Sequence, residues 1–549
     1  MNRACWFEEF EQRRKLMGRL PTNLQNTILD AIIIGAGING AGIARDAAMR
    51  GLKVLLLDKG DIGGGTSSWS TRLIHGGLRY LEHGEFSLVR ESLRERETLL
   101  RIAPHLVRPL PILIPIYKDA RRGPWTIRAG MIAYDLLSFN KTLPRHQMLS
   151  RAQALNRAPG LNSEDLVGAA LYYDAQVEFA ERLVLENVLS AVEHSALVVT
   201  QARVDKVIVE NGAARGVEFL NELSGERQSA RARIVINAAG PWVDQVLGQA
   251  GANSARLIGG TKGSHLIVAE FPGAPSGALY TEAQADSRPF FIIPWNGNYL
   301  IGTTDIRYEG DLDHVQIEGQ EIDYLLRETN RLIPQANLTR DHILYTYSGV
   351  RPLPFTDDRD ERSITRRHFI REHPHLHGLL SIVGGKLTTY RSLAEQAVDL
   401  ILRKLGRTAR VCTTDKVPLP GAVTPDFTSF REEFKASSGL PARTSDRLLR
   451  IYGTRAREVL KLAVKDPSLA DTFNQDADAI AAEVVFSFTH EMAETLSDYL
   501  LRRTMVGLNS ACGLDAVDAA AKIAQESLGW TEDRVQQEKA DYRTYVARR

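Results

Sequence analysis

The sequence predicts an α/β protein in which an antiparallel sheet is inserted into a parallel one and an all-helical domain follows. Three observations lead to this prediction. Residues 28–58 alternate strand, glycine-rich turn, helix and strand; short strands with tight turns dominate about 165–310; and the chain after about 428 is mostly helical. At 549 residues, the chain is also too long for a single hydrophobic core.

The expected domain boundaries follow these changes in texture. We predict an N-terminal extension over 1–27, an α/β region over 28–410 and a helical C-terminal cap domain over 411–549. The parts of the parallel sheet are expected at about 28–110, 165–245 and 345–410, and the inserted sheet, with the substrate-binding surface, at about 246–344. Within the inserted sheet, Trp295-Asn296-Gly297-Asn298 is a strong hairpin turn signal.

The charge balance and the cysteines exclude some functional classes. Lys and Arg total 68 against 67 for Asp and Glu, so the net charge is +1. A general nucleic-acid binder usually has a basic excess, so we expect no nucleic-acid partner, and any bound anion needs a local cluster of cations. Cys5, Cys412 and Cys512 are too far apart in sequence to suggest a disulfide framework or a paired-cysteine metal site, so we predict no metal.

The N-terminal residues and the lengths of the apolar runs indicate whether to expect a signal peptide or a membrane-spanning segment. Glu8, Glu9 and Glu11 precede a basic cluster and no apolar stretch follows, so we expect no signal peptide. No run of 18 apolar residues occurs, and we therefore expect no membrane-spanning segment. Attachment to a membrane surface stays open, because it needs only an amphipathic face.

The first motif that carries chemistry is Gly35-Ala36-Gly37-Ile38-Asn39-Gly40. It lies between a buried strand and a helix, and the next strand ends in Asp58 at about the spacing of the Rossmann fingerprint. Glycines allow a tight turn and close approach to a pyrophosphate, while the helix N-terminus offers free N–H groups. Asp58 would accept hydrogen bonds from ribose hydroxyls and repel a 2′-phosphate, so the motif indicates a Rossmann-like dinucleotide site that disfavours NADP.

Three further segments favour FAD over NAD. Thr66, Ser67 and Ser68 follow a run of glycines and provide hydroxyls for a phosphate or the flavin edge. A strand then ends in Ala239 and Gly240, which leave room for a planar ring. Finally, Gly385-Lys386-Leu387-Thr388 begins a helix whose N-terminus would stabilise negative charge on a reduced flavin. Each segment alone could be only a tight turn, but the three in this order predict FAD.

A group of cations indicates an anionic substrate. Arg72, His75, Arg79 and Tyr80 lie close together in sequence, and Arg351, Arg366 and Lys386 come much later beside glycines and strand ends. His75 is the nearby group whose pKa suits proton acceptance at neutral pH. The alternatives are solvated surface cations and a core histidine.

These motifs together resemble the FAD-dependent, quinone-linked aerobic glycerol-3-phosphate dehydrogenases. The matching segments run in order over roughly 28–400 and are 33–44, 73–82, 237–243, 262–265, 301–305, 346–353 and 384–391. The helical tail also matches, most clearly at Leu501-Arg502-Arg503-Thr504. Two departures are Asp58, where the family usually has Glu, and Arg72, where Lys is common.

The resemblance implies a non-covalently bound FAD and oxidation of sn-glycerol 3-phosphate to dihydroxyacetone phosphate. It also implies electron transfer to quinone, peripheral attachment to the cytoplasmic face of the plasma membrane, and a homodimer. The implied catalytic residues are His75, Arg351 and Lys386, and the implied substrate residues are Arg79, Tyr80, Arg351, Arg366 and Lys386. The implied cofactor residues are Gly35, Gly37, Ile38, Asn39, Gly40, Asp58, Thr66, Ser67, Ser68, Arg72, His75, Gly76, Gly77, Ala239, Gly240, Gly385, Lys386, Leu387 and Thr388.

Three other functions fit parts of the pattern. A glycerol-phosphate oxidase of the same family would use oxygen in place of quinone. An amino-acid or sarcosine-type oxidase would share the fold but need fewer cations for its carboxylate substrate. A non-catalytic flavin-binding regulatory protein would need neither the proton acceptor nor the anion cluster.

Overall fold

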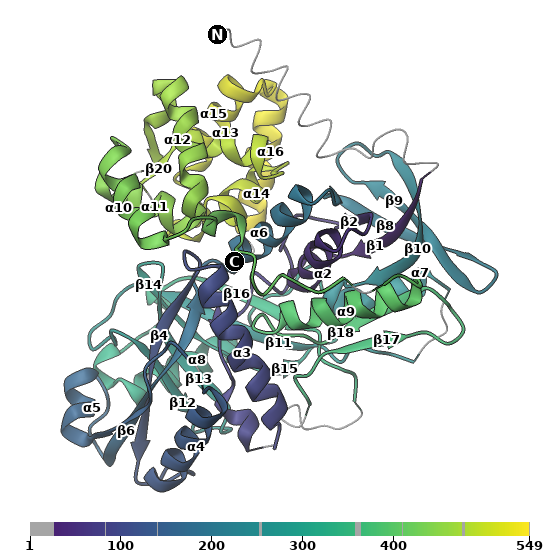
Figure 1. The fold of residues 1–549 in the computed structure, drawn as a ribbon. Helices are drawn as coiled ribbons and strands as arrows, with labels where there is room; N and C mark the ends of the chain where they lie inside the picture. The colour runs from purple at the N-terminus through teal and green to yellow at the C-terminus, as the bar shows by residue number, and fades with distance from the viewer. Residues whose placement is uncertain are drawn as a thin grey trace.

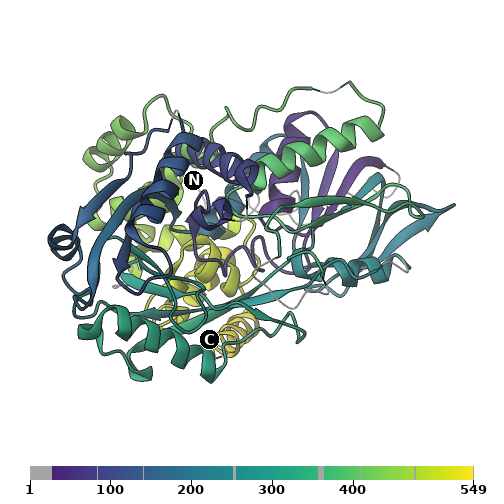
Figure 2. The same cartoon turned by 90° about the horizontal axis from the view of Figure 1, so that it is seen from below.

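The computed structural model describes residues 27–82, 84–139, 141–251, 255–356, 364–408, 410–474 and 478–547. Two sheets lie side by side, and a helical C-terminal domain covers one end of them (Figures 1 and 2). This arrangement confirms the predicted fold class. The extension predicted over 1–27 lies outside the described residues except for Thr27.

The first sheet has a parallel centre with strand order β18, β10, β1, β2 and β7. The strands are β1 (Ile28–Ile34), β2 (Val54–Leu57), β7 (Leu197–Val199), β10 (Arg227–Asn237) and β18 (Leu379–Val383). Strand β17 (Phe369–Glu372) adds to one edge, and the hairpin β8 (Ala202–Glu210) and β9 (Ala213–Asn221) extends β10.

Both faces of this sheet are buried. Ala31 and Ile33 of β1 face one core, shared with α2 (Ile38–Met49), α6 (Ala180–Glu193) and α9 (Tyr390–Lys404). Leu29, Ile32 and Ile34 face a second core, shared with α7 (Val243–Gln249). A strand buried on both faces needs a continuous apolar run, which is the pattern of 31–34 in the sequence.

The second sheet has ten strands and extends beyond the predicted range of 246–344. Its later strands are β11 (Thr261–Val268), β12 (Ala278–Glu282), β13 (Pro289–Trp295), β14 (Asn298–Gly302), β15 (Ile306–Arg307) and β16 (Ile343–Arg351). The earlier ones are β3 (Leu73–Ile74), β4 (Val107–Tyr117), β5 (Gln147–Ser150) and β6 (Leu166–Val177). The hairpin predicted at Asn296-Gly297 joins β13 to β14, with φ of 50° and 75° at these two residues.

Helices cover both faces of the second sheet. Helices α3 (Phe86–Ile102) and α4 (Pro124–Leu137) share one core with it. Helices α5 (Arg151–Arg157) and α8 (Gly319–Leu332) share another core on the opposite side of the sheet. Arg96 of α3 and Tyr134 of α4 both bind Asp174 of β6, and these bonds hold the two helices in place.

The C-terminal domain is built of helices with one small hairpin. The helices are α10 (Phe427–Ser437), α11 (Ala442–Tyr452), α12 (Ala456–Lys465), α13 (Ala481–His490), α14 (Leu496–Asp498), α15 (Val517–Leu528) and α16 (Glu532–Val546). The hairpin of β19 (Thr472–Asn474) and β20 (Ala479–Ile480) was not predicted. Buried ion pairs tie the domain to the rest of the protein: Arg503 binds Asp61 at 2.7 Å and Glu491 binds Arg182 at 2.6 Å.

Candidate functional site

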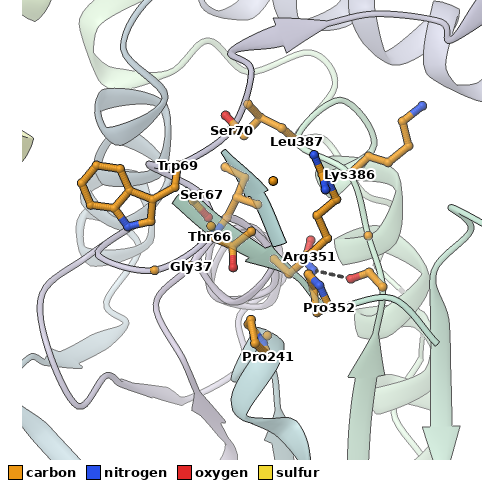
Figure 3. A pocket seen from close by; sticks show the side chains of 18 of the residues that line it. Gly37, Thr66, Ser67, Trp69, Ser70, Pro241, Arg351, Pro352, Lys386 and Leu387 are labelled. Carbon is orange, nitrogen blue, oxygen red and sulfur yellow. Dashed lines mark hydrogen bonds between the residues drawn. The ribbon is translucent and has the colours of Figure 1, made fainter. Parts of the chain in front are cut away.

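A cavity of about 1260 Å³ lies where the two sheets meet. Its lining comes from the β1–α2 turn, the loop 58–80, the segments 238–242 and 349–353, and the turn before α9 (Figure 3). Ordinary small-molecule pockets measure roughly 300–1,000 Å³, so this cavity has room for a dinucleotide together with a small substrate.

The glycine turn fits a closely approaching pyrophosphate. A Cβ added at Gly37 would meet only Ser67 Oγ, at 3.5 Å, so this backbone is open toward the cavity. By contrast, a Cβ at Gly40 would lie 1.8 Å from the Gly35 carbonyl oxygen, and Gly35 itself has a φ of +105°. The buried Asn39 Oδ1 has no hydrogen-bond partner among the described residues, which leaves an acceptor at the start of α2.

Asp58 closes the turn at the end of β2. Its carboxylate accepts hydrogen bonds from the Ala36 N–H at 2.6 Å and the Gly60 N–H at 2.9 Å. Burial raises the pKa of Asp58, although these two N–H groups oppose the shift. A carboxylate fixed in this way at the cavity wall has the chemistry to accept hydrogen bonds from ribose hydroxyls.

The hydroxyl loop contributes fewer contacts than the sequence predicts. Thr66 and Ser67 line the cavity, and Ser67 Oγ also accepts a hydrogen bond from the Ile38 N–H at 3.0 Å. Ser68 does not line it, because its hydroxyl donates to the Gly63 carbonyl at 2.6 Å within the loop. The prediction of direct ligand contact therefore needs correction for Ser68.

Three other predicted cofactor residues have structural roles. Gly40 and Gly76 lie behind the cavity wall, where Gly76 donates its N–H to Tyr134 Oη at 2.9 Å. The Arg72 guanidinium is fully buried and forms a bidentate pair with Glu181, with both bonds at 2.7 Å. Arg72 also belongs to the cavity lining, although its guanidinium is paired with Glu181 and holds the loop in place. Its contact with a cofactor stays a prediction.

The turn before α9 brings a helix N-terminus to the cavity. Gly384 and Gly385 have φ of 78° and 103°, and a Cβ at Gly385 would lie 2.6 Å from Asn39 Nδ2. The glycine turn before α2 and the glycine turn before α9 therefore pack directly against each other. Thr388 Oγ1 accepts a hydrogen bond from the His75 N–H at 3.2 Å, which fixes the loop carrying His75.

Two of the predicted cations converge through a carboxylate that the sequence analysis did not single out. Asp305 accepts a hydrogen bond from Arg351 at 2.9 Å and one from Arg366 at 2.9 Å, and all three residues line the cavity. Burial alone would raise the pKa of Asp305, but the charges of Arg351 and Arg366 outweigh it and lower the pKa to about 2. Asp305 therefore stays ionised and fixes the two guanidinium groups.

The remaining predicted substrate residues lie at the same end of the cavity. The Lys386 ammonium donates to Ser92 Oγ at 3.0 Å and lies 4.6 Å from the centroid of the Tyr80 ring. Burial lowers the pKa of Lys386, although Tyr80 and Asp174 oppose the shift. Arg79 lines the cavity, and its guanidinium has no hydrogen-bond partner within the described ranges. The cavity thus brings together the five predicted substrate residues, Arg79, Tyr80, Arg351, Arg366 and Lys386. Their contact with a substrate stays a prediction.

Two uncharged histidines line the cavity. Burial, with the charges of Lys386 and Arg96, lowers the pKa of His75 from 6.5 to about 3, well below the near-neutral value expected from sequence. His265 of β11 was not predicted as a site residue; it hydrogen-bonds to Thr71 Oγ1 at 3.0 Å and has a pKa well below 6.5 because of its burial. Its buried Nδ1 has no partner among the described residues, and its motif 262–265 was the available signal.

These histidines predict loss of stability in acid. The unfolded chain binds a proton at each imidazole below about pH 6.5, whereas the native state does not, so the native state loses stability as the pH falls through this value. We expect each histidine to cost about 1 kcal/mol by about pH 5.5. Chemical denaturation of wild type and of His265→Gln at about pH 6.5 and about pH 5.5 measures the free energy of unfolding that each protein loses in acid. An equal acid-induced loss in the two proteins would mean that His265 is charged in the native state.

The C-terminal domain closes one end of the cavity, which the sequence did not reveal. Thr495, Ser497, Asp498, Arg502 and Tyr545 belong to its lining. Burial would raise the pKa of Asp61, but Arg503 and Arg502 lower it, so a charged network connects this domain to the loop after Asp58. In the part of the chain that is described, no cluster of side chains suits a metal ion. None of the described helices combines the length and apolarity of a bilayer-spanning segment.

The comparisons with known proteins agree with this geometry. The family of FAD dependent oxidoreductases matches residues 30–391, and the C-terminal domain of alpha-glycerophosphate oxidase matches 412–535. A glycerol-3-phosphate dehydrogenase from Synechocystis sp. is 48% identical over 95% of this chain and 97% of its own. A D-erythritol 1-phosphate dehydrogenase from Brucella abortus is 39% identical over 86% of this chain and 94% of its own.

A solved structure agrees with these sequence matches. The glycerol-3-phosphate dehydrogenase from Bacillus halodurans, complexed with FAD, is 28% identical, covers 98% of each chain and has a TM-score of 0.81. The match extends over the nucleotide-binding part, the second sheet and the C-terminal domain together. The chain therefore belongs to the FAD-dependent oxidoreductases, in the group that contains the glycerol-3-phosphate dehydrogenases, and FAD is its cofactor.

Proposed function

We propose that the protein oxidises sn-glycerol 3-phosphate to dihydroxyacetone phosphate and passes the electrons to a membrane quinone. The observation that carries the proposal is the group of cations at one end of the cofactor cavity, formed by Arg79, Arg351, Arg366 and Lys386. A phosphomonoester carries close to two negative charges at neutral pH, and its burial requires several cations. The relatives named for glycerol-3-phosphate support the same substrate.

The cavity residues divide into cofactor and substrate groups. We assign Gly35, Gly37, Ile38, Asn39 and Asp58 to the nucleotide part of FAD, and Thr66, Ser67 and the segments around Ala239 and Leu387 to its flavin part. Bound FAD supplies the hydride acceptor for oxidation of the secondary alcohol. Arg351 and Arg366 then hold the substrate phosphate, and Lys386 and Tyr80 orient its hydroxyl groups.

The alcohol proton needs an acceptor within the cavity. His75 and His265 are both uncharged at neutral pH, so each imidazole has a nitrogen lone pair. We assign proton acceptance to His75, because its loop is fixed to Thr388 beside the predicted flavin position. The substrate phosphate would lower the cost of protonating His75, since it offsets the nearby positive charge of Lys386.

The FAD is expected to be bound without a covalent link. The proposal follows from the resemblance, and His75 is the cavity residue that could instead carry a covalent flavin. Acid precipitation of the yellow protein should release the flavin into the supernatant, where its absorbance is measured. Flavin that stays in the pellet after washing would contradict the non-covalent assignment and direct attention to His75.

Anaerobic reduction of the bound flavin tests the substrate. We expect sn-glycerol 3-phosphate to bleach the flavin absorbance rapidly and glycerol to do so very slowly, because glycerol lacks the phosphate. D-erythritol 1-phosphate appears in the name of the Brucella relative, so it is the second polyol phosphate to compare with sn-glycerol 3-phosphate in the same assay. Rapid bleaching by an amino acid and none by either phosphate ester would overturn the proposal.

Reoxidation of the reduced protein tests the acceptor. We expect a soluble quinone analogue to restore the flavin absorbance much faster than dissolved oxygen does. We also expect the activity to sediment with the cytoplasmic membrane after cell lysis and to be released by mild detergent. Rapid oxygen consumption by a fully soluble activity would instead indicate a glycerol-phosphate oxidase. Sedimentation equilibrium of the released protein tests the proposed homodimer.

A further inference from the structure

Helix α4 carries an exposed apolar face. Trp125 is 77% exposed, Leu136 is 71% exposed and Phe139, just beyond the helix, is 67% exposed, while Ile132 is 45% exposed. With the exposed Ala129, these positions follow the spacing of one helical face, at intervals of three and four residues. Large apolar side chains are usually exposed singly on soluble proteins, so an exposed row of them suggests an interaction surface.

The opposite face of α4 is fixed in the protein. Met131 and Tyr134 are buried in the core beneath the second sheet, and they also follow helical spacing. Tyr134 Oη accepts a hydrogen bond from the Gly76 N–H at 2.9 Å and donates one to Asp174 at 2.7 Å. These contacts fix α4 to the protein by its inner face. The helix lies at the edge of the molecule, at the end opposite the C-terminal domain (Figure 1).

The charges around this face are mainly positive and unpaired. Arg121, Arg128 and Arg145 are exposed and have no carboxylate partner within the described ranges, and the Arg128 guanidinium lies 5.8 Å from the centroid of the Trp125 ring. Within the described part of residues 118–145, Asp119 is the one carboxylate that has no cationic partner. Asp135 is paired with Lys141 and His146. Aromatic and apolar side chains flanked by arginines suit an anionic lipid surface.

We propose that the outer face of α4 is the membrane-docking surface, with Trp125, Ile132, Leu136 and Phe139 inserted among the acyl chains of an anionic bilayer. Arg121, Arg128 and Arg145 then lie at the level of the phosphate groups. This inference rests on the proposed peripheral attachment and names the surface responsible. The inner face of α4 contacts Gly76 in the loop 58–80, so docking would bring the membrane close to a loop that lines the cavity.

Vesicle binding by the FAD-loaded protein tests the apolar contacts. We expect wild type to sediment with vesicles that contain phosphatidylglycerol, and Leu136→Gln and Trp125→Gln each to lower the partition coefficient about tenfold. Leu223→Gln is the matched control, because Leu223 is 55% exposed in the turn between β9 and β10, far from α4 in the sequence. Equal binding by Leu136→Gln, Leu223→Gln and wild type would overturn the assignment to α4.

A second pair of variants tests the charges. Arg128→Gln should weaken binding to phosphatidylglycerol vesicles about fivefold at low salt and leave binding to phosphatidylcholine vesicles unchanged. Arg215→Gln, at an exposed arginine of β9, is its control and should behave as wild type. Equal loss with both lipids would contradict the electrostatic part of the proposal.

The remaining outcomes separate this inference from the proposed function. Flavin reduction by sn-glycerol 3-phosphate in detergent solution should be the same in wild type and in the α4 variants. If wild type reduces its flavin normally but binds no vesicles, both the docking surface and the peripheral attachment fail while the dehydrogenase assignment stands. If the α4 variants keep their vesicle binding but lose a dimer seen with wild type, the face binds a second copy of this chain and the lipid proposal fails.

Discussion

Replacing Gly40 by alanine is expected to destabilise the nucleotide-binding part of the protein strongly. The added Cβ would lie 1.8 Å from the Gly35 carbonyl oxygen and 3.0 Å from its carbon, and these are backbone atoms. Gly35 has little room to move, because even a Cβ built on it would lie 2.6 Å from the Ala238 carbonyl oxygen. We expect a loss of at least about 3 kcal/mol in the free energy of unfolding, together with loss of the bound flavin.

Gly37→Ala is the matched comparison. Its Cβ would meet only Ser67 Oγ at 3.5 Å, and the backbone of Gly37, with φ of −70°, is accessible to alanine. We expect the apoprotein to keep its stability within about 0.5 kcal/mol and to bind FAD more weakly, since the methyl group points into the cavity. Chemical denaturation of both apoproteins and titration with FAD measure the two effects. Normal FAD affinity of Gly37→Ala would mean that the cofactor does not approach this turn.

This contrast explains why the nucleotide site could be predicted from the sequence. Glycine is required at 40 because of the Gly35 carbonyl five residues earlier, and at 35 because of its φ of +105°, so both requirements leave a local signature. The additional crowding of Gly35 by Ala238 comes from a distant part of the chain and leaves no such signature. The same holds for the hairpin at Asn296-Gly297, whose positive φ values favour these two residue types. Short-range geometry of this kind is visible in the order of residues alone.

The second sheet could not be predicted to its full extent, because its pairing is between distant segments. Pro109, Pro111 and Pro115 lie within β4, which pairs with β6 over its whole length, although proline disfavours the interior of a strand. Residues two apart in a strand direct their N–H groups to the same edge, so the even spacing of these prolines leaves the other edge free to bond. The pairing partner, β6, is about 60 residues away in sequence and gives no local signal.

The sequence predicted several residues that line the site, but not the residues with which they form ion pairs. Arg72 and Arg351 look alike in sequence, yet one is bound to Glu181 and the other to Asp305 in the cavity. His265 and Arg502 reach the cavity only because β11 and the C-terminal domain are folded against the nucleotide-binding part. Burial and pairing of such groups depend on the whole fold, and the shift of the His75 pKa to about 3 has the same origin.

Arg351→Ala is expected to lower kcat/KM for sn-glycerol 3-phosphate by about 10- to 150-fold, which corresponds to the roughly 1.5–3 kcal/mol of one charge-assisted hydrogen bond. The Arg351 guanidinium is positioned by Thr303 Oγ1 at 3.0 Å and by Asp305 at 2.9 Å, so no other cation can take its place without moving. Glycerol oxidation, although slow in both proteins, should fall much less, because glycerol has no phosphate to lose contact with.

A second substitution separates the loss of a phosphate contact from the exposure of a carboxylate. In Arg351→Ala, Asp305 keeps Arg366 but loses half of its pairing, and its negative charge then repels the substrate phosphate. Adding Asp305→Asn should therefore recover several-fold of the lost kcat/KM, although Asp305→Asn alone should be harmful because it frees both arginines. The flavin spectrum should be unchanged in all three variants. If Arg351→Ala oxidises sn-glycerol 3-phosphate as well as wild type with its FAD intact, the phosphate does not bind at this end of the cavity.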